Sequence, residues 1–249
     1  MIIDAGVYMG PSLFDSGLSC EEIVRNLDRL KIDRAVLIPA RPPEYSLEIA
    51  NRRVSEAVKS HPDRLAGLCR IDPWQGASAV AETFRCLDEY AVGVYLDPRE
   101  ENFQINSESV SPIVMAAAQQ DAPVVVNAGY PLVSHPTQVR DLARRFPEVQ
   151  FVATNGGQIN ISGMLLSEAR RMLEACPNIV IATSGTYRED FLEEVMTEVG
   201  EDRVLFASRS PVYDQEFELA RVRLAHLEDR QKARMYGETA ASVFGLEAG

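Results

Sequence analysis

Short apolar runs alternate with longer amphipathic stretches along the whole chain. Eight of these runs are nearly continuous in hydrophobicity, which is typical of strands that are buried on both faces. Their starts are spaced by roughly 30 residues, the length of one strand–helix–loop unit. The pattern predicts strands at 2–7, 35–38, 65–69, 92–96, 123–126, 149–153, 179–182 and 204–206.

The stretches between these runs carry hydrophobic residues at helical spacing. Ser19 and Glu22 have the spacing of a capping box, which marks the start of a helix. Ile23, Leu27 and Leu30 follow on one face of that helix, as expected for a face that packs against a core. Similar stripes are formed by Val80, Phe84 and Leu87, by Val139, Leu142 and Phe146, by Leu166, Ala169, Leu173 and Cys176, and by Phe191, Val195 and Val199.

Eight strand–helix units in 249 residues predict an α/β fold, a (β/α)8 TIM barrel that forms a single domain over residues 1–249. The alternative is a doubly wound open sheet, which usually carries a Gly-rich phosphate loop after its first strand. Residues 5–10 read Ala-Gly-Val-Tyr-Met-Gly, which is not that pattern, and the chain has no Walker motif. The barrel is therefore favoured.

Composition and charge narrow the class of protein. A hydrophobic share of 46% with 25% charged residues is an ordinary globular balance and excludes intrinsic disorder. A net charge of −12 argues against nucleic acid or an anionic membrane as partner. No apolar run reaches the roughly 18 residues of a membrane span. The first residues lack the features of a signal peptide, and the four cysteines are not at metal-binding spacing, so we expect a cytoplasmic protein with free thiols.

The chemistry of a barrel enzyme lies where the strands end and the following loops begin. At those positions this chain has polar residues in every unit. They are Asp4 and Tyr8 with Gly6 between them, then Arg41, Arg70 and Asp72, Tyr95 and Asp97, Asn127 and Tyr130, Thr154 and Asn155, Thr183 and Ser184, and Ser208 and Arg209.

Several phrases at these and neighbouring positions occur together in one known family. They are Met-Ile-Ile-Asp-Ala at 1–5, His-Pro-Asp-Arg-Leu at 61–65, Arg-Ile-Asp-Pro at 70–73, Ala-Arg-Arg-Phe-Pro at 143–147, Gly-Glu-Asp-Arg-Val-Leu-Phe at 200–206 and Ala-Ala-Ser-Val-Phe-Gly-Leu at 240–246. In this order the chain resembles the amidohydrolase superfamily, in its amidohydrolase-related group of decarboxylases and hydrolases of small carboxylic acids. The resemblance covers essentially the whole chain and implies a TIM barrel.

The chain departs from the resemblance at the positions that hold the divalent metal. The family opens with Asp-Ala-His-x-His, and the resemblance implies further ligands at the ends of strands five, six and eight. This chain has Gly6 and Tyr8 for the two opening histidines, Asn127 and Asn155 for the histidines of strands five and six, Arg209 for the aspartate of strand eight, and Tyr95 and Asp97 where strand four often has lysine and histidine.

These residues do not suit a metal site. A catalytic zinc needs about three ligands from His, Cys or carboxylate groups. A guanidinium close to a divalent cation would also repel it by several kcal/mol, on the order that Coulomb's law gives for a partly buried pocket. His61 precedes the third strand, His135 follows the fifth, and His226 lies on the last helical pattern. None of the three is therefore placed to replace a missing metal ligand. We therefore expect no metal and no cofactor.

Arg209 has two interpretations that can coexist. It can form a buried ion pair with Asp4 or Asp97, because a buried guanidinium normally needs an anionic partner. It can also bind the carboxylate of a ligand in a bidentate manner. The candidate catalytic residues are thus Asp4, Asp97 and Arg209.

The candidate ligand-binding residues are Tyr8, Tyr95, Asn127, Asn155 and Arg209. The two asparagine amides can hydrogen-bond a ligand, or they can satisfy each other and the backbone. The tyrosines can narrow a pocket and supply apolar walls with a polar tip, or they can be ordinary packing residues.

Two classes of function remain open. The first, which we favour, is a metal-free pseudoenzyme that binds a small anionic molecule or is the partner of an active relative; a homo-oligomer is also compatible with the sequence. The second is a metal-independent hydrolase, lyase or isomerase acting on a small carboxylate. An Arg209 tied to Asp4 and Asp97 without an open cavity favours the first. An open cavity with a carboxylate of raised pKa facing Arg209 favours the second.

Overall fold

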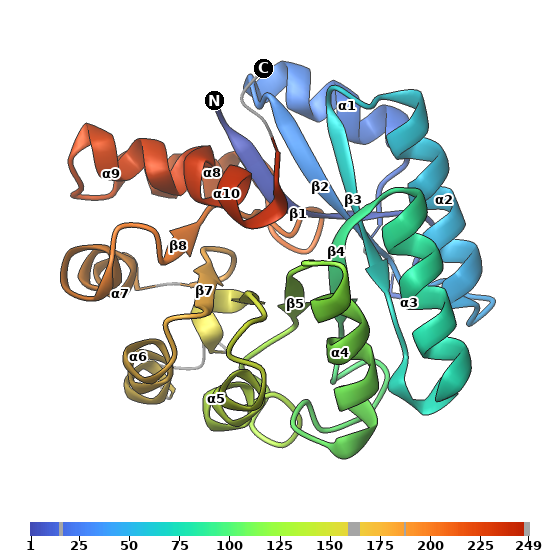
Figure 1. The fold of residues 1–249 in the computed structure, drawn as a ribbon. Helices are drawn as coiled ribbons and strands as arrows, with labels where there is room; N and C mark the ends of the chain where they lie inside the picture. The colour runs from blue at the N-terminus through green and yellow to red at the C-terminus, as the bar shows by residue number, and fades with distance from the viewer. Residues whose placement is uncertain (15–16, 159–164, 187, 247–249) are drawn as a thin grey trace.

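Eight parallel strands form one sheet, ordered β1 to β8 as in the chain (Figure 1). The protein is seen in a computed structural model that describes residues 1–14, 17–158, 165–186 and 188–246. The strands are β1 Ile3–Met9, β2 Arg34–Pro39, β3 Leu65–Arg70, β4 Ala91–Leu96, β5 Val124–Val126, β6 Phe151–Ala153, β7 Ile179–Ala182 and β8 Val204–Leu205.

The sheet closes on itself between its last and first strands. Backbone hydrogen bonds join the chain around and after β8 to β1: Ala5 donates to the carbonyl of Phe206 at 2.9 Å, and Arg209 donates to the carbonyl of Gly6 at 2.7 Å. Tyr8 donates to the carbonyl of Ser210 at 2.9 Å. The eight strands thus form a single-domain (β/α)8 TIM-barrel fold, which confirms the predicted fold class.

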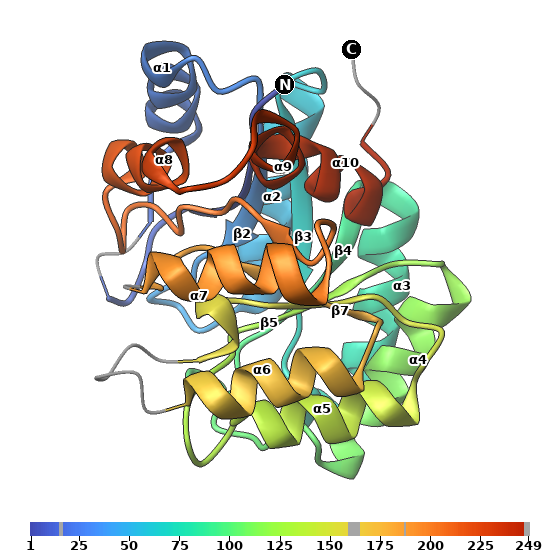
Figure 2. The same cartoon turned by 90° about the vertical axis from the view of Figure 1, so that its left-hand side faces the viewer.

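Helices cover the outside of the barrel, as the two views in Figures 1 and 2 show. They are α1 Cys20–Leu30, α2 Leu47–Ser60, α3 Ala77–Glu89, α4 Ser111–Gln119, α5 Pro136–Arg145, α6 Leu166–Ala175, α7 Glu189–Glu194, α8 Gln215–Leu224, α9 Asp229–Ala233 and α10 Thr239–Phe244. Short 3₁₀ segments occur at Pro73–Gln75, Glu108–Val110 and Asn155–Gly157, and π-helical turns at Val195–Val199 and Arg234–Glu238.

The hydrophobic core has two layers because the strands are buried on both faces. One layer fills the barrel and includes Ile3, Ala5, Leu68 and Val125. The other layer lies between the sheet and the helices and includes Leu27, from the apolar face of α1. This arrangement explains why the strand runs are nearly continuous in hydrophobicity.

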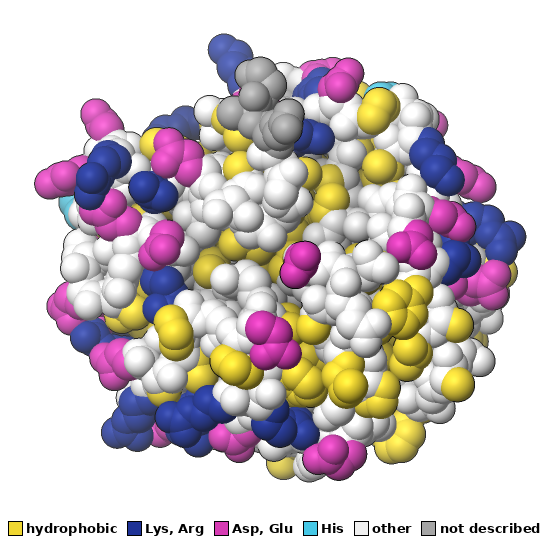
Figure 3. Space-filling view, viewed as in Figure 1, with side chains coloured by type: hydrophobic (Ala, Val, Ile, Leu, Met, Phe, Trp, Pro, Cys, Tyr) yellow, Lys and Arg dark blue, Asp and Glu magenta, His cyan; other side chains and the backbone are white. Residues whose placement is uncertain are grey.

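Charged side chains of both signs lie around the rim of the face seen in Figure 3, while hydrophobic and uncharged atoms occupy more of its middle. In the part of the chain that the structure describes, no helix combines the length and the apolar character that crossing a bilayer requires.

Candidate functional site

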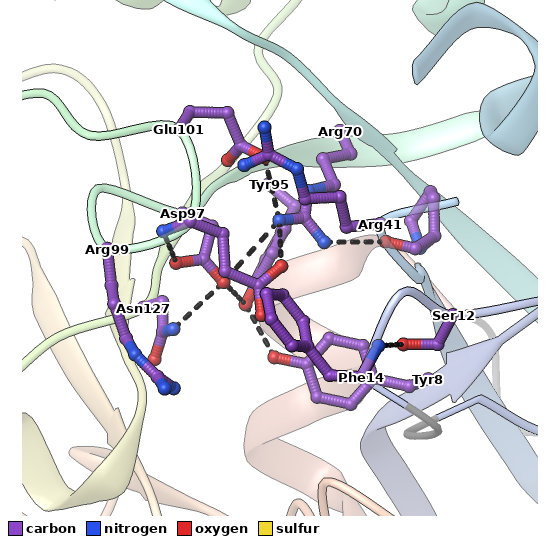
Figure 4. A network of polar contacts seen from close by, with 12 residues as sticks. Tyr8, Ser12, Phe14, Arg41, Arg70, Tyr95, Asp97, Arg99, Glu101 and Asn127 are labelled. Carbon is purple, nitrogen blue, oxygen red and sulfur yellow. Dashed lines mark hydrogen bonds and ion pairs between the residues drawn. The ribbon is translucent and has the colours of Figure 1, made fainter. Parts of the chain in front are cut away.

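Six of the predicted site residues meet at the carboxyl end of the barrel and form one closed ring of hydrogen bonds, which we call the polar ring. Each is at most 5% exposed. They come from β1, β4, β5, β6 and β8 or from the residues directly after these strands. Figure 4 shows several of them pointing toward one another. The polar ring consists of Tyr8, Tyr95, Asp97, Asn127, Asn155 and Arg209.

One half of the polar ring runs through two phenols. Nη2 of Arg209 donates to the hydroxyl of Tyr8 at 2.7 Å, and the hydroxyls of Tyr8 and Tyr95 are 2.8 Å apart. Tyr95 donates to Oδ2 of Asp97 at 3.0 Å. Because each hydroxyl has one proton and the Tyr95 proton points to Asp97, Tyr8 must donate to Tyr95. The donors therefore all run in one direction, from the guanidinium to the carboxylate.

The other half of the polar ring runs through two amides. Nη1 of Arg209 donates to Oδ1 of Asn155 at 2.5 Å. Nδ2 of Asn155 donates to the carbonyl of Ala128 at 2.9 Å and lies 3.4 Å from Oδ1 of Asn127. Nδ2 of Asn127 then donates to Oδ2 of Asp97 at 2.9 Å. A cation and an anion thus lie at opposite sides of the ring and are joined by two paths of neutral groups.

The neutral state of both phenols follows from where they lie. Burial raises the pKa of Tyr8, although the positive charge of Arg209 opposes this. Burial, together with the negative charge of Asp97, raises the pKa of Tyr95 well above its usual value. Both hydroxyls therefore keep the protons that the directed chain of hydrogen bonds needs.

The expected direct ion pair of Arg209 with Asp4 or Asp97 is not formed. Among the residues described here, no carboxylate oxygen lies within ion-pair distance of Arg209, and Nε of Arg209 is buried without a hydrogen-bond partner. The charge of Asp97 instead faces Arg70, whose Nη2 lies 3.8 Å from Oδ2. Arg209 reaches Asp97 only through the phenols and amides of the polar ring.

Asp4 lies outside the polar ring. Its neighbours in β1, Ile3 and Ala5, point into the barrel, so the alternation of the strand directs Asp4 outward. Its carboxylate accepts hydrogen bonds from the backbone and hydroxyl of Ser208, at 2.8 and 2.5 Å, and from Nε2 of Gln215 at 2.7 Å. Burial raises the pKa of Asp4 despite these contacts. The residue joins β1 and the end of β8 to α8 and does not face Arg209.

A second buried charge cluster lies behind the polar ring and was not assigned a role from the sequence. Arg70, at the end of β3, is fully buried and donates to Glu100 at 2.5 Å and to Glu101 at 2.8 Å. Burial raises the pKa of Glu101 to about 7, while Arg70 opposes that rise. The signal for this cluster was present, because a charged residue ended an otherwise apolar run that was predicted to be a buried strand.

A cavity of about 380 Å³ opens in front of the polar ring. Tyr8 and Arg209 form part of its wall, so the ring is within reach of a bound molecule. The sequence reasoning missed several wall residues because they belong to loops whose course cannot be read from a strand pattern. Among the described residues, the lining consists of Tyr8, Phe14, Arg99, Glu100, Tyr130, Arg209, Pro211, Val212 and Tyr213.

The donor set at this end of the barrel does not fit a divalent metal. The described residues contain no group of three His, Cys, Asp or Glu side chains that could hold a metal ion. The polar ring offers phenol and amide groups that are already hydrogen-bonded, and a guanidinium repels a dication. A Cβ at Gly6 would lie 4.0 Å from Cγ of Arg209, so this position also borders the ring without contributing a ligand. That these positions correspond to metal ligands in relatives stays a prediction from the resemblance.

The three histidines lie away from the cavity. His61 follows the last residue of α2, and the side chain of His135 caps the start of α5. His226 lies in the loop between α8 and α9, so its expected position on a helix was wrong. None of the three lines the cavity.

Comparison with known families decides where this chain belongs. Residues 42–246 match the sequence model described as Amidohydrolase. The chain belongs to the amidohydrolase family. The predicted resemblance is thereby confirmed at the level of the family, whereas a search of curated protein sequences finds no match.

Solved structures of amidohydrolase-family enzymes share the fold of this chain. A 5-carboxyvanillate decarboxylase from Novosphingobium aromaticivorans, with manganese and 4-hydroxy-3-methoxy-5-nitrobenzoic acid, has a TM-score of 0.79 at 15% identity, covering 99% of this chain and 96% of that chain. A dihydroxybenzoic acid decarboxylase from a Polaromonas species, with manganese and 2-nitroresorcinol, has a TM-score of 0.77 at 16% identity, covering 100% and 98%. A 4-oxalomesaconate hydratase from Rhodopseudomonas palustris has a TM-score of 0.71 at 18% identity, covering 98% and 96%. At such identities the likeness shows the fold alone.

Proposed function

We propose that this member of the amidohydrolase family binds a small organic carboxylate at the mouth of its barrel, through Arg209 and without a metal ion. The observation that carries the proposal is an arginine that is 5% exposed, borders an open cavity and has no carboxylate partner among the described residues. A buried charge without a counterion is costly. A ligand carboxylate would supply the missing anion.

The hydrogen bonding of Arg209 leaves room for such a ligand. A guanidinium has five N–H groups. Tyr8 and Asn155 accept one hydrogen bond each from the two terminal nitrogens. These two contacts fix the orientation of the guanidinium while leaving donors for a carboxylate, which matches the planar fork of arginine.

The walls of the cavity suit an organic anion with an apolar body. Phe14, Tyr130 and Tyr213 surround the space in front of Arg209. Aromatic walls combined with one fixed charge are typical of small-molecule sites. The decarboxylases that share this fold bind manganese together with nitro-substituted aromatic compounds. The small acidic aromatic ligands in those structures support the proposal that a small organic acid binds here. Their manganese, however, does not fit the residues of this site.

The arrangement of carboxylates favours binding over catalysis. Burial raises the pKa of Asp4 and of Glu101, but Asp4 faces Ser208 and Glu101 faces Arg70. Neither lies against Arg209, and Glu100, which lines the cavity, is paired with Arg70. Among the described residues, no carboxylate therefore lies directly beside Arg209 as an acid–base partner. We therefore propose a pseudoenzyme that binds a carboxylate.

One observation supports a second candidate, a metal-independent lyase or isomerase that acts on a carboxylate. The directed chain from Tyr8 through Tyr95 ends on the carboxylate of Asp97. A proton taken from a ligand at Tyr8 can pass along this chain if Tyr8 gives its own proton to Tyr95 and Tyr95 gives its own to Asp97. Turnover of any bound acid would favour this candidate.

The binding proposal is tested by titrating benzoate calorimetrically into the chelator-treated protein. Arg209→Met should weaken benzoate binding at least tenfold, because charge-assisted hydrogen bonds contribute about 1.5–3 kcal/mol. Arg209→Lys, which keeps the charge but loses the planar fork, should show a smaller loss. It also provides the test if the methionine variant does not fold.

Arg25→Met is the matched control. Arg25 is exposed on α1 and does not line the cavity, so its substitution removes the same charge without touching the site. Benzoate affinity should be unchanged in this variant. Equal benzoate affinity in the wild-type protein and in both Arg209 variants contradicts the proposal.

A further inference from the structure

A second arginine, Arg99, borders the same cavity as Arg209. It is exposed and belongs to the loop that follows β4. Its guanidinium carbon lies 5.3 Å from the centre of the Tyr130 ring, and Nη1 is 3.3 Å from the hydroxyl of Tyr130. Stacking and hydrogen bonding to one tyrosine hold the guanidinium in place at the cavity wall. Figure 4 shows Arg99 on the same loop as Asp97.

The positive charge of Arg99 is not matched by an ion pair. Within the described ranges, no carboxylate oxygen lies at ion-pair distance from it. Among the described residues, the carboxylate that also lines the cavity is Glu100, and it is directed to Arg70, with Oε2 only 2.5 Å from Nη2. Glu100 thus forms an ion pair with the buried Arg70 behind the polar ring, and the guanidinium of Arg99 is left to bind an anion.

The balance of charge around the cavity is locally positive in a chain whose net charge is −12. Among the described residues that line it, two are arginines and one is a carboxylate, and that carboxylate is paired with Arg70. A site of this kind attracts anions even in an acidic protein. The charged groups on the described lining are Arg99, Arg209 and Glu100.

We infer that the ligand is a small dicarboxylate, with one carboxylate on Arg209 at the inner end of the cavity and the other on Arg99 at its wall. The inference rests on the proposed function and adds that the ligand has a second carboxylate, which Arg99 binds. The cavity contains two guanidiniums, and neither has a carboxylate partner among the described residues. A molecule with two carboxylates would pair with both. Phe14 and Val212 line the same space and suit an apolar spacer between the two groups.

The inference is tested with pairs of acids that differ by one carboxylate. The pairs are succinate with butyrate, glutarate with pentanoate, and isophthalate with benzoate. Three spacers are used so that at least one can fit the separation of the two arginines. In calorimetric titrations of the chelator-treated wild-type protein, at least one diacid should bind about tenfold more tightly than its monoacid, the effect of one added charge-assisted contact.

Arg99→Gln identifies the group that recognises the second carboxylate. In this variant the preferred diacid should lose its advantage over its monoacid, while the affinity for the monoacid falls by a smaller factor than the affinity for the diacid. Arg99 is exposed, so its substitution should leave folding intact. Arg25→Gln removes one exposed charge on α1, away from the cavity. This variant should keep the full preference for the diacid.

The possible failures are distinguishable. If all three monoacids bind as tightly as their diacids and Arg209→Met weakens them equally, the dicarboxylate inference is wrong while the carboxylate site at Arg209 stands. If a diacid is preferred but Arg99→Gln keeps that preference, the assignment to Arg99 is overturned. If no acid binds the wild-type protein, both the inference and the proposed function fail.

Discussion

Asn155 and Arg209 hold left-handed backbone conformations, with φ of 58° and 54°. This conformation costs a residue with a side chain about 1–2 kcal/mol. Both residues belong to the polar ring, and their side chains are hydrogen-bonded to each other at 2.5 Å. The unusual backbone therefore occurs where two strand ends must turn their side chains toward one another, which supports a functional role for the ring.

The candidate residues could be predicted individually, but their contacts could not. Position after a strand was enough to select Tyr8, Asn127 and Arg209, because parallel strands in a barrel end on one face. The partner of Arg209 depends on side-chain rotamers and on the bulge of β1 between Asp4 and Val7, which a single sequence does not reveal. This is why an expected carboxylate partner proved to be a phenol and an amide.

Removing one hydroxyl from the polar ring should destabilise the fold. Tyr8→Phe leaves a guanidinium N–H and the hydroxyl oxygen of Tyr95 without their buried partner, and a cost of about 1–3 kcal/mol is expected. Urea denaturation followed by circular dichroism measures it. Tyr130→Phe, at the less buried cavity wall, should change stability by no more than about 0.5 kcal/mol. Equal stability of Tyr8→Phe and the wild-type protein means that the ring does not hold the barrel mouth together.

Among the elements, those with a strong local signal were predicted best. The capping box at the start of α1 is present as expected, with the Ser19 side chain accepting from the backbone of Glu22 at 3.2 Å and the Glu22 side chain accepting from the backbone of Ser19 at 2.8 Å. β1 continues to Met9, two residues beyond the predicted end, because Tyr8 and Met9 pair with β2. Strand ends of this kind depend on the neighbouring strand, which local sequence does not specify.

Helices α2 and α4 were not among the predicted stripes. In α2 the buried face includes Asn51 and Ser55, which interrupt an apolar stripe. Asn51 is buried because its side chain exchanges hydrogen bonds with the backbone of Arg70, at 2.8 and 3.1 Å. In α4, apolar residues occupy most positions, so no polar face marks the helix. The wall of the cavity was missed for a related reason, since it is built from loops.

The capping box gives a prediction for a whole element. Ser19→Ala removes the hydrogen bond to the first turn of α1 and should lower the free energy of unfolding by about 1 kcal/mol. Ser19→Asn keeps a capping oxygen and should restore most of that loss. Thermal melts of the three proteins measure the differences. A Ser19→Ala protein that melts with the wild-type protein would show that α1 is held by its packing alone.

At the scale of the whole molecule, barrel closure creates the site. Tyr8 and Arg209 are 201 positions apart in the chain, and their side chains are 2.7 Å apart in the fold. The repeating strand–helix unit was enough to predict this closure, since eight units form a complete barrel. Net charge was less informative, because an acidic chain contains a cavity lined by two arginines. The overall charge predicts that partners needing an extended basic surface do not bind, and this stays a prediction, but it does not determine the sign of the charge in a pocket.

The central claim is that Arg209, and not a metal ion, binds the ligand of this amidohydrolase-family barrel. Calorimetric titration of benzoate into chelator-treated protein, and again after addition of manganese, tests it most directly. We expect measurable binding in both titrations with the same dissociation constant, because the guanidinium supplies the positive charge. Binding that appears only after manganese is added would contradict the account.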